Sequence, residues 1–244
     1  MPNYWSGVVA DSKSREAILE NVRSALKSKS SPPASHVASV SNQAAAKLTQ
    51  TQSTGDQAPG ETIQRFASEL IRIGGRFQHC VGDKEAFEYI EQLALDRRSK
   101  MIISWNVPLL TDVDLRTRFE EKDIIFETGI TGRELISKAA EADIGISGVD
   151  YALADTGTLV LFAGELQPRS VSLLPPVHVA IVRPQQILPG LGDLFPFLQG
   201  ESNGLRNLSS AITFITGPSR TADIELKLVV GVHGPQELHV LVVD

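Results

Sequence analysis

The amino-acid sequence predicts an α/β fold whose sheet contains parallel strand pairs. Two observations predict this fold class, and a third predicts how the chain is divided. Between residues 61 and 142, segments with apolar residues at helical spacing alternate with short apolar runs. After Asp143, strand-like runs of Val, Ile, Leu and Thr dominate, and Gly and Pro separate them. Before residue 61, a stretch poor in large apolar side chains follows a single helical segment. A chain of 244 residues accommodates one large domain with such an appendage.

The first helical segment spans residues 12–26, and Asp11 or Ser12 can cap its start. One apolar stripe runs along it, made of Ile18, Leu19, Val22, Ala25 and Leu26. Such a stripe covers either the protein's own body or another chain, and both interpretations are open. Residues 28–60 are rich in Ser, Ala, Gln and Thr and have too few large apolar residues to offset chain entropy. We therefore expect an N-terminal helix within residues 1–27, a flexible linker over 28–60 and a compact domain over 61–244.

The compact domain begins with a helix near Glu61 that ends at Gly74 and Gly75, because glycine favours a helix C-terminus. Strands and helices then alternate along the chain. They are a strand over 76–81, a helix over 83–94 with Asp83 as its cap, a strand over 101–104, a helix over 112–118, a strand over 123–126 and a helix over 131–142. This alternation indicates parallel strand pairs.

The second half of the chain is richer in strands. We expect strands over residues 144–149, 158–162, 177–182, 211–215, 228–232 and 238–242, with one helix over 187–198 between them. Loops at the ends of strands are where α/β sheets usually bind ligands. The turns of this half are therefore the first place to expect functional residues.

Composition excludes several classes of function. The chain has 23 Lys and Arg against 29 Asp and Glu, a net charge of −6, which argues against nucleic acid as a partner because phosphate binding needs clustered basic residues. It has no run of about 18 apolar residues, so we expect no membrane span. The start lacks a secretory signal, so we expect a cytoplasmic protein. Cys80 is the single cysteine, so the chain alone holds neither a disulfide nor an iron–sulfur cluster, which needs about four thiolates.

The common phosphate-binding and catalytic motifs are absent from the sequence. It contains no GxxxxGK[ST] and no GxGxxG, and residues 145–149 depart from the GxSxG nucleophile elbow at the last position. The five histidines form no HExxH pair, so we expect no metal site in this chain.

One polar turn stands directly before an apolar strand. It consists of Asp155, Thr156, Gly157 and Thr158. Gly157 permits a positive φ or a close backbone approach, and the neighbouring side chains present oxygens at that point. The turn is either part of a ligand site or a tight hairpin whose hydroxyls satisfy its own backbone.

A second segment, residues 215–225, runs from a strand into Gly217 and Pro218 and then carries hydroxyl residues around an arginine. If Thr221 begins a helical turn, its free N–H groups and the hydroxyl of Ser219 make an anion site, which Arg220 completes as a clamp for carboxylate or phosphate. The acidic candidates are Asp223 and Glu225. The alternative is a capped turn with solvated charges.

Two further residues are candidates. His233 lies in a strand-ending turn that follows this segment, and imidazole works as an acid or base near neutral pH. A structural histidine bonded to a turn carbonyl is the alternative. Arg169 is a second candidate anion contact or a surface ion pair of little energy.

Four stretches resemble a known family. They are DTGTLVL at 155–161, RSVSLLPPVHVAIV at 169–182, TGPSRTADIE at 216–225 and GVHGP at 231–235. They are similar to the LUD domain, the lactate-utilisation domain of the LutC/YkgG family, over roughly residues 61–244. TGPSRTADIE followed closely by GVHGP is the specific part of this resemblance, whereas DTGTLVL alone is a weak signal.

The resemblance implies a Rossmann-like mixed sheet related to the sugar-phosphate isomerase/CoA-transferase superfamily. It also implies that the chain works with partner proteins, one of which carries iron–sulfur clusters, in the oxidation of L-lactate to pyruvate. The chain is then the cluster-free subunit, needs no cofactor of its own, and binds a small anionic ligand at strand-end loops. Asp223, Glu225 and His233 are the residues expected to position or protonate that ligand.

Two other functions stay open. The chain is alternatively a stand-alone enzyme that acts on sugar phosphates or CoA thioesters, with Glu225 as base or nucleophile. It is alternatively a scaffold that uses the N-terminal stripe to dock its partners.

Overall fold

The computed structural model describes residues 59–106, 115–164, 166–201, 209, 211–222 and 228–244, together with Glu20. The chain forms two units, residues 1–43 and 44–244, and every described residue except Glu20 belongs to the second. Apart from Glu20, the helix expected over 12–26 lies outside the described residues, as does the linker up to residue 58. The first helix of the second unit, α3, starts at Pro59, close to the predicted start of the compact domain.

Helices and strands alternate through the first part of this unit and give way to strands later. The helices are α3 (Pro59–Arg72), α4 (Asp83–Asp96), α6 (Leu115–Glu120), α7 (Gly132–Glu141), α8 (Arg169–Leu173) and α9 (Leu191–Glu201), with a short 3-10 helix at Pro184–Gln186. The α/β class predicted from the sequence is therefore confirmed.

Six strands form one parallel sheet in the order β1-β12-β7-β4-β2-β3. Their bounds are β1 (Arg76–Cys80), β2 (Met101–Ser104), β3 (Ile125–Thr128), β4 (Ile144–Gly148), β7 (Val177–Val182) and β12 (Glu237–Val243). The central strands are buried on both faces and largely apolar, apart from Ser147, His178 and His239, as expected where helices or a second sheet cover both sides.

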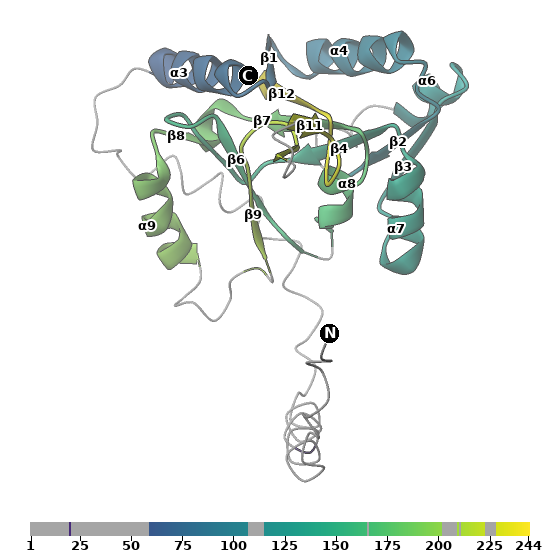
Figure 1. The fold of residues 1–244 in the computed structure, drawn as a ribbon. Coiled ribbons are helices and arrows are strands. Elements are labelled where there is room, and N and C mark those ends of the chain that lie inside the picture. Colours follow the sequence, from purple (N-terminus) through teal and green to yellow (C-terminus); the bar gives the residue numbers. More distant parts are fainter. Residues whose placement is uncertain are drawn as a thin grey trace, which may run out of the picture. The chain divides into compact units, whose positions relative to one another are not determined.

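Two apolar cores cover the two faces of this sheet. On one face, α4 and α6 bring Ile90 and Phe119 into a core with the strands. On the other face, α3, α7 and α8 contribute a second core that includes Leu70 and Val171. Figure 1 shows α4 and α6 on one side of β2, β3 and β4, and α7 and α8 on the other side. Each fully buried large aliphatic or aromatic side chain contributes about 1.5–3 kcal/mol, so these cores account for much of the stability.

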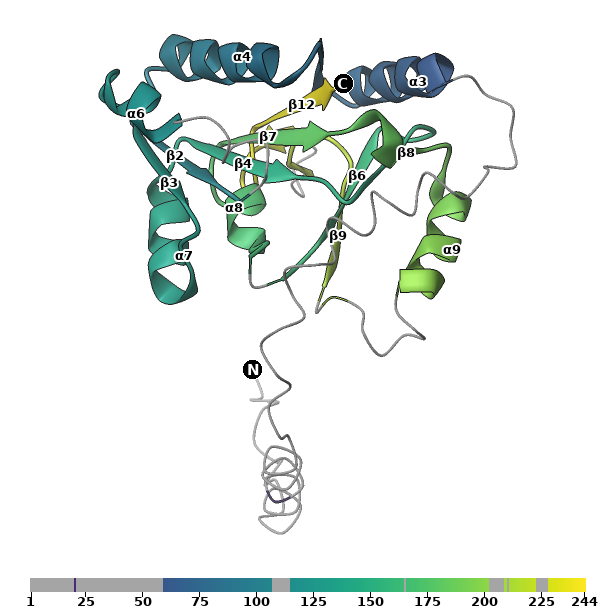
Figure 2. The same cartoon turned by 180° about the vertical axis from the view of Figure 1, so that it is seen from behind.

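A second sheet has four strands in the order β8-β5-β6-β9. The strands are β5 (Tyr151–Leu153), β6 (Thr158–Phe162), β8 (Ile187–Leu188) and β9 (Ile212–Ile215). One face joins the core of α3, α7 and α8, and the other packs on Leu194 and Phe197 of α9 (Figure 2). A two-stranded ribbon, β10 (Arg220–Ala222) with β11 (Leu228–Val230), leads into β12.

The end of α3 follows from its sequence. Phe66 and Leu70 are fully buried along its apolar face. The helix stops where Gly74 takes φ +88, and the N–H of Gly75 then donates to the carbonyl of Leu70 at 2.9 Å. A left-handed glycine that satisfies the last carbonyls is a common helix C-cap, so the predicted end is confirmed.

Several predicted elements need correction. The helix expected over 187–198 begins at Leu191, because Ile187 and Leu188 are buried in β8 and Pro189 and Gly190 follow it. Asp83 does not cap α4. The N-cap is Gly82, and the Asp83 carboxylate pairs with Arg183 at 3.0 Å. The short elements β5, α8 and β10 were not predicted.

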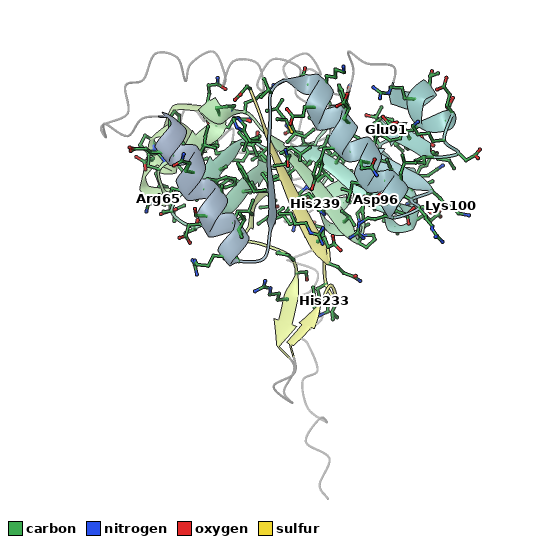
Figure 3. All side chains as sticks on the ribbon, turned by 90° about the horizontal axis from the view of Figure 1, so that it is seen from above. Arg65, Glu91, Asp96, Lys100, His233 and His239 are labelled. Carbon is green, nitrogen blue, oxygen red and sulfur yellow. The ribbon has the colours of Figure 1, made fainter. Side chains whose placement is uncertain are left out.

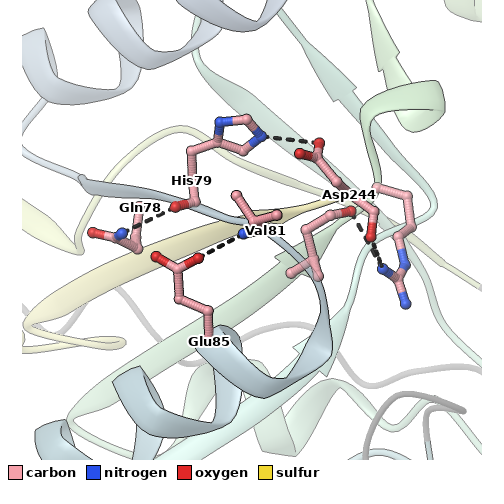
Figure 4. Close-up of polar contacts among 7 residues, drawn as sticks. Gln78, His79, Val81, Glu85 and Asp244 are labelled. Atoms are coloured by element: carbon pink, nitrogen blue, oxygen red, sulfur yellow. Dashed lines mark hydrogen bonds and ion pairs between the residues drawn. The ribbon is translucent and has the colours of Figure 1, made fainter.

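Polar contacts join the carboxyl ends of β1, β12 and β7 (Figure 4). His79 Nε2 lies 2.9 Å from the Asp244 carboxylate. Arg183 Nη1 donates to the carbonyl oxygens of Val243 and Asp244 at 3.3 and 3.0 Å. These contacts hold the end of β12 to the neighbouring strands.

Candidate functional site

The two polar turns predicted from the sequence lie next to each other. β6 and β9 pair antiparallel, with Leu159 opposite Ile215. The next residues in register, Thr158 and Thr216, have their hydroxyl oxygens 2.9 Å apart, and Thr158 is buried. The turn at 155–158 and the turn that starts at Gly217 are therefore neighbours, although about 60 residues separate them in the sequence.

Both turns pack against the end of α3 through glycines. Gly157 has φ +65, and a Cβ added there would lie 2.5 Å from the backbone nitrogen of Leu70. Gly217 has φ +86, and its Cβ would lie 2.9 Å from the carbonyl oxygen of Ile73. No other residue type fits this combination of left-handed backbone and close approach. The close approach expected at Gly157 is confirmed, and the group approached is a helix of the same chain.

Arg220 also contacts this helix end. Its Nη2 donates to the carbonyl oxygen of Ile73 at 2.7 Å, and the side chain is exposed. The last carbonyls of a helix carry partial negative charge, which favours a cation and disfavours an anion. The guanidinium is thus a cap for α3, and anion binding by Arg220 stays a prediction.

The helical turn expected at Thr221 is wrong. Arg220 to Ala222 form strand β10, in which Thr221 pairs with Val229 of β11. The N–H of Ser219 donates to the carbonyl oxygen of Pro235 at 2.8 Å. The backbone here is extended, so it offers no row of free helical N–H groups. Asp223 and Glu225 fall between β10 and β11, outside the described residues.

The histidines differ in their partners. His239 is buried between Tyr89, at 2.8 Å, and Glu237, at 3.2 Å. His233 is exposed next to the ribbon and bonds to no residue that the structure describes, and Figure 3 shows it apart from His239. Acid–base action by His233 stays a prediction.

Asp155, in the turn before β6, is half-buried and lies beside Gly190, directly before the start of α9. Its N–H donates to the carbonyl oxygen of Pro189 at 3.1 Å, and its Oδ2 lies 2.7 Å from where a Cβ of Gly190 would be. Its Oδ1 is buried without a partner in the described part of the chain. The carboxylate thus faces the N-terminal end of a helix, a favourable place for negative charge. Thr156 beside it is exposed.

A hollow opens at the carboxyl ends of β2 and β3. The empty space there amounts to about 260 Å³ when the part open to solvent is included. The residues around it come from the ends of these strands, from α7 and from the segment before α8: Ser104, Trp105, Asn106, Gly129, Ile130, Thr131, Leu135, Leu166 and Pro168. Arg169 follows Pro168 directly and is exposed. No hydrogen bond or ion pair in the described chain joins Arg169 to either polar turn, so the predicted site residues fall into two groups.

Asp150 is a residue that sequence reasoning missed. It follows the end of β4 and accepts a hydrogen bond from the N–H of Phe162 at 2.6 Å. Burial raises its pKa to about 6, against the lowering effect of that bond. Shifted carboxyls cluster at functional sites, and the signal available in the sequence was its position directly after a buried strand.

Replacing Asp150 with asparagine should stabilise the protein at neutral pH. Because the folded-state pKa is raised from 3.8 to about 6, the folded state holds its proton more tightly, and stability falls as pH rises through this window. The variant keeps an acceptor for Phe162. We expect the free energy of unfolding in urea to rise by about 2 kcal/mol at pH 7.5 and to match the wild type at pH 4. If the variant and the wild type differ in free energy of unfolding by the same amount at pH 7.5 and at pH 4, this expectation is contradicted.

In the part of the chain that the structure describes, no three His, Cys, Asp or Glu side chains are placed to hold a metal ion. None of the described helices has the length and apolar character needed to cross a bilayer.

Comparisons with known proteins identify the family. The model of the LUD domain matches residues 63–243. Lactate utilization protein C of Halalkalibacterium halodurans is 37% identical over 155 residues, 64% of this chain and 67% of that protein. The protein of the same name from Bacillus subtilis is 45% identical over 115 residues, 46% of this chain and 48% of that protein. A crystal structure of a DUF162 family protein from Deinococcus radiodurans shares the fold with a TM-score of 0.54 at 20% identity, covering 77% of this chain and 99% of that one. The chain belongs to the LUD domain family.

Proposed function

We propose that this chain is a subunit, without an iron–sulfur cluster of its own, of a cytoplasmic system that oxidises L-lactate to pyruvate. The observation that carries the proposal is the similarity to proteins named lactate utilization protein C, at 37% identity over 155 residues. The presence of a single cysteine supports the proposal that this chain has no iron–sulfur cluster of its own. Cys80 is buried, and burial raises its pKa to about 11, so its thiol is a poor ligand at neutral pH.

A subunit without a cluster contributes by binding a ligand or by organising its partners. We propose that it binds a small anion at strand-end loops. Arg169 and Arg220 are the exposed cations among the predicted residues, and the exposed His233 is the predicted acid or base. The buried pair of Thr158 and Thr216 supports the turn to which Arg220 belongs.

Reconstitution tests the proposal. Purified iron–sulfur partner subunits are given L-lactate and an electron-accepting dye, with and without this chain, and pyruvate formation is measured. We expect the rate to be at least about tenfold lower without the chain. Equal rates would refute the proposed function.

Two variants refine that assay. Cys80→Ala should restore the full rate, because the thiol is not expected to hold a cluster, and a lost rate with a folded protein would refute the cluster-free role. The variants Arg169→Ala and Arg220→Ala distinguish the two groups of predicted residues. Their rates are compared under conditions in which both variants are fully folded. The variant that raises the lactate concentration needed for half the maximal rate marks the group that meets the anion.

A further inference from the structure

The guanidinium of Arg220 already has a partner within the chain. Its Nη2 donates to the carbonyl oxygen of Ile73 at 2.7 Å, directly after the end of α3. Among the described residues, this carbonyl is the only hydrogen-bond acceptor of the side chain, which is exposed. The same group that the proposed function needs as an anion contact therefore serves as part of a helix end.

Glycines make room for this contact. Gly74 has φ +88, and a Cβ added there would lie 2.2 Å from Nη2 of Arg220. Gly217, three residues before Arg220, approaches the same carbonyl, because its Cβ would lie 2.9 Å from the oxygen of Ile73. The guanidinium thus lies directly against the backbone of Gly74. Any side chain at Gly74 would push it out of this position.

The end of α3 disfavours an anion at the place where the guanidinium now lies. The last carbonyl oxygens of a helix carry partial negative charge, which attracts the guanidinium and repels a carboxylate or phosphate. A strong anion contact uses two parallel N–H donors of one arginine. To bind in this way at low energetic cost, an anion must draw the guanidinium of Arg220 away from Ile73.

We propose that the contact between Arg220 and Ile73 is autoinhibitory: Arg220 caps α3 when no anion is bound, and leaves the cap to bind one. The inference rests on the proposed function for the anion itself, and adds how that site is regulated. Because only the uncapped state binds, capping raises the apparent dissociation constant of the anion. By linkage, anion binding loosens the end of α3 to the same extent.

Gly74→Ala tests this inference without changing Arg220. The added Cβ displaces the end of a flexible side chain, so it removes the cap and keeps the cation. Dissociation constants for pyruvate and for inorganic phosphate are measured by calorimetry on the full chain. We expect Gly74→Ala to bind about two- to fivefold more tightly than the wild type. Arg220→Ala should bind at least about tenfold more weakly, and the double variant should be as weak as Arg220→Ala.

Gly132→Ala is the matched control. Gly132 also has a positive φ, +69, but a Cβ there meets nothing within 4 Å. This variant has a side chain at positive φ and leaves Arg220 untouched, so we expect wild-type affinity. Unchanged or weaker binding by a folded Gly74→Ala protein, or equally tighter binding by Gly132→Ala, would overturn the inference.

Hydrogen exchange of the wild-type chain provides a measurement that needs no variant. The N–H of Gly75 donates to the carbonyl oxygen of Leu70 at 2.9 Å. The N–H of Gly74 donates to that of Ile71, also at 2.9 Å, so both amides report whether the end of α3 is closed. We expect saturating pyruvate or phosphate to speed their exchange about two- to fivefold.

The outcomes separate this inference from the proposed function. If an anion binds and the exchange of the two amides is unchanged or slower, the autoinhibitory contact is overturned and the proposed function stands. If neither pyruvate nor phosphate binds, the inference also fails, and the reconstitution assay decides the proposed function separately.

Discussion

Replacing Gly157 with valine should lower the free energy of unfolding by about 3 kcal/mol or more. The residue has φ +65, where a side chain costs about 1–2 kcal/mol. In addition, the new Cβ would lie 2.5 Å from the backbone nitrogen of Leu70 and 2.7 Å from its Cα, so the turn or α3 must move. Overpacking of a rigid contact adds about 1–3 kcal/mol. Urea unfolding followed by circular dichroism measures the sum.

Gly129→Val is the matched control for this variant. Gly129 has φ +71, close to the φ of Gly157, but a Cβ there meets nothing within 4 Å. The control therefore retains the energetic cost of a side chain at positive φ and omits the steric clash with α3. We expect it to lose only about 1–2 kcal/mol. If both variants lose the same amount, the contact between the turn and α3 contributes nothing.

Acid should destabilise the fold through His178. This side chain is fully enclosed, and its Nε2 lies 2.8 Å from the hydroxyl oxygen of Ser147. Burial, with a smaller contribution from His239, lowers the pKa of His178 to about 3. The unfolded chain therefore takes up a proton below about pH 6.5 that the folded chain does not, so stability falls as pH falls from 6.5 toward 3. Between pH 7.5 and pH 5 this residue should cost about 2 kcal/mol.

A double variant isolates that loss. Ser147→Ala with His178→Leu removes the titrating ring and its partner together, because a lone serine hydroxyl left in the core would cost about 1–3 kcal/mol. Unfolding free energies are compared at pH 7.5 and pH 5. The wild type should lose about 2 kcal/mol more than the double variant over this interval. A parallel loss in both proteins would show that His178 does not titrate as its burial implies.

The fold was more predictable than the site. Strands such as β2 and β7 were found from runs of apolar residues, because burial on both faces leaves a signal within a few positions. β5 and β10 were missed because three residues are too few for any periodicity, and their existence depends on partners far along the chain. Local sequence does not carry that information.

The role of Arg220 shows why the site was harder to predict. A glycine, a hydroxyl and an arginine near a strand end look alike whether they hold an anion or cap a helix. What makes Arg220 a helix cap is the carbonyl oxygen of Ile73, almost 150 residues away in the sequence. Asp150 was missed for a related reason, since its shifted pKa comes from burial by β6, which the sequence does not display locally.

The position of β12 has a consequence for synthesis of the protein. β1 has β12 as its neighbour in the sheet, with Arg76 opposite His239, and β12 in turn separates β1 from β7. A nascent chain therefore holds α3, β1 and α4 beside an unfilled slot in the sheet until residues 237–243 leave the ribosome. The sheet closes only after β12 has been synthesised, so the apolar edges of β1 and β7 stay unpaired during that interval, as is typical of sheets built from pairings distant in sequence.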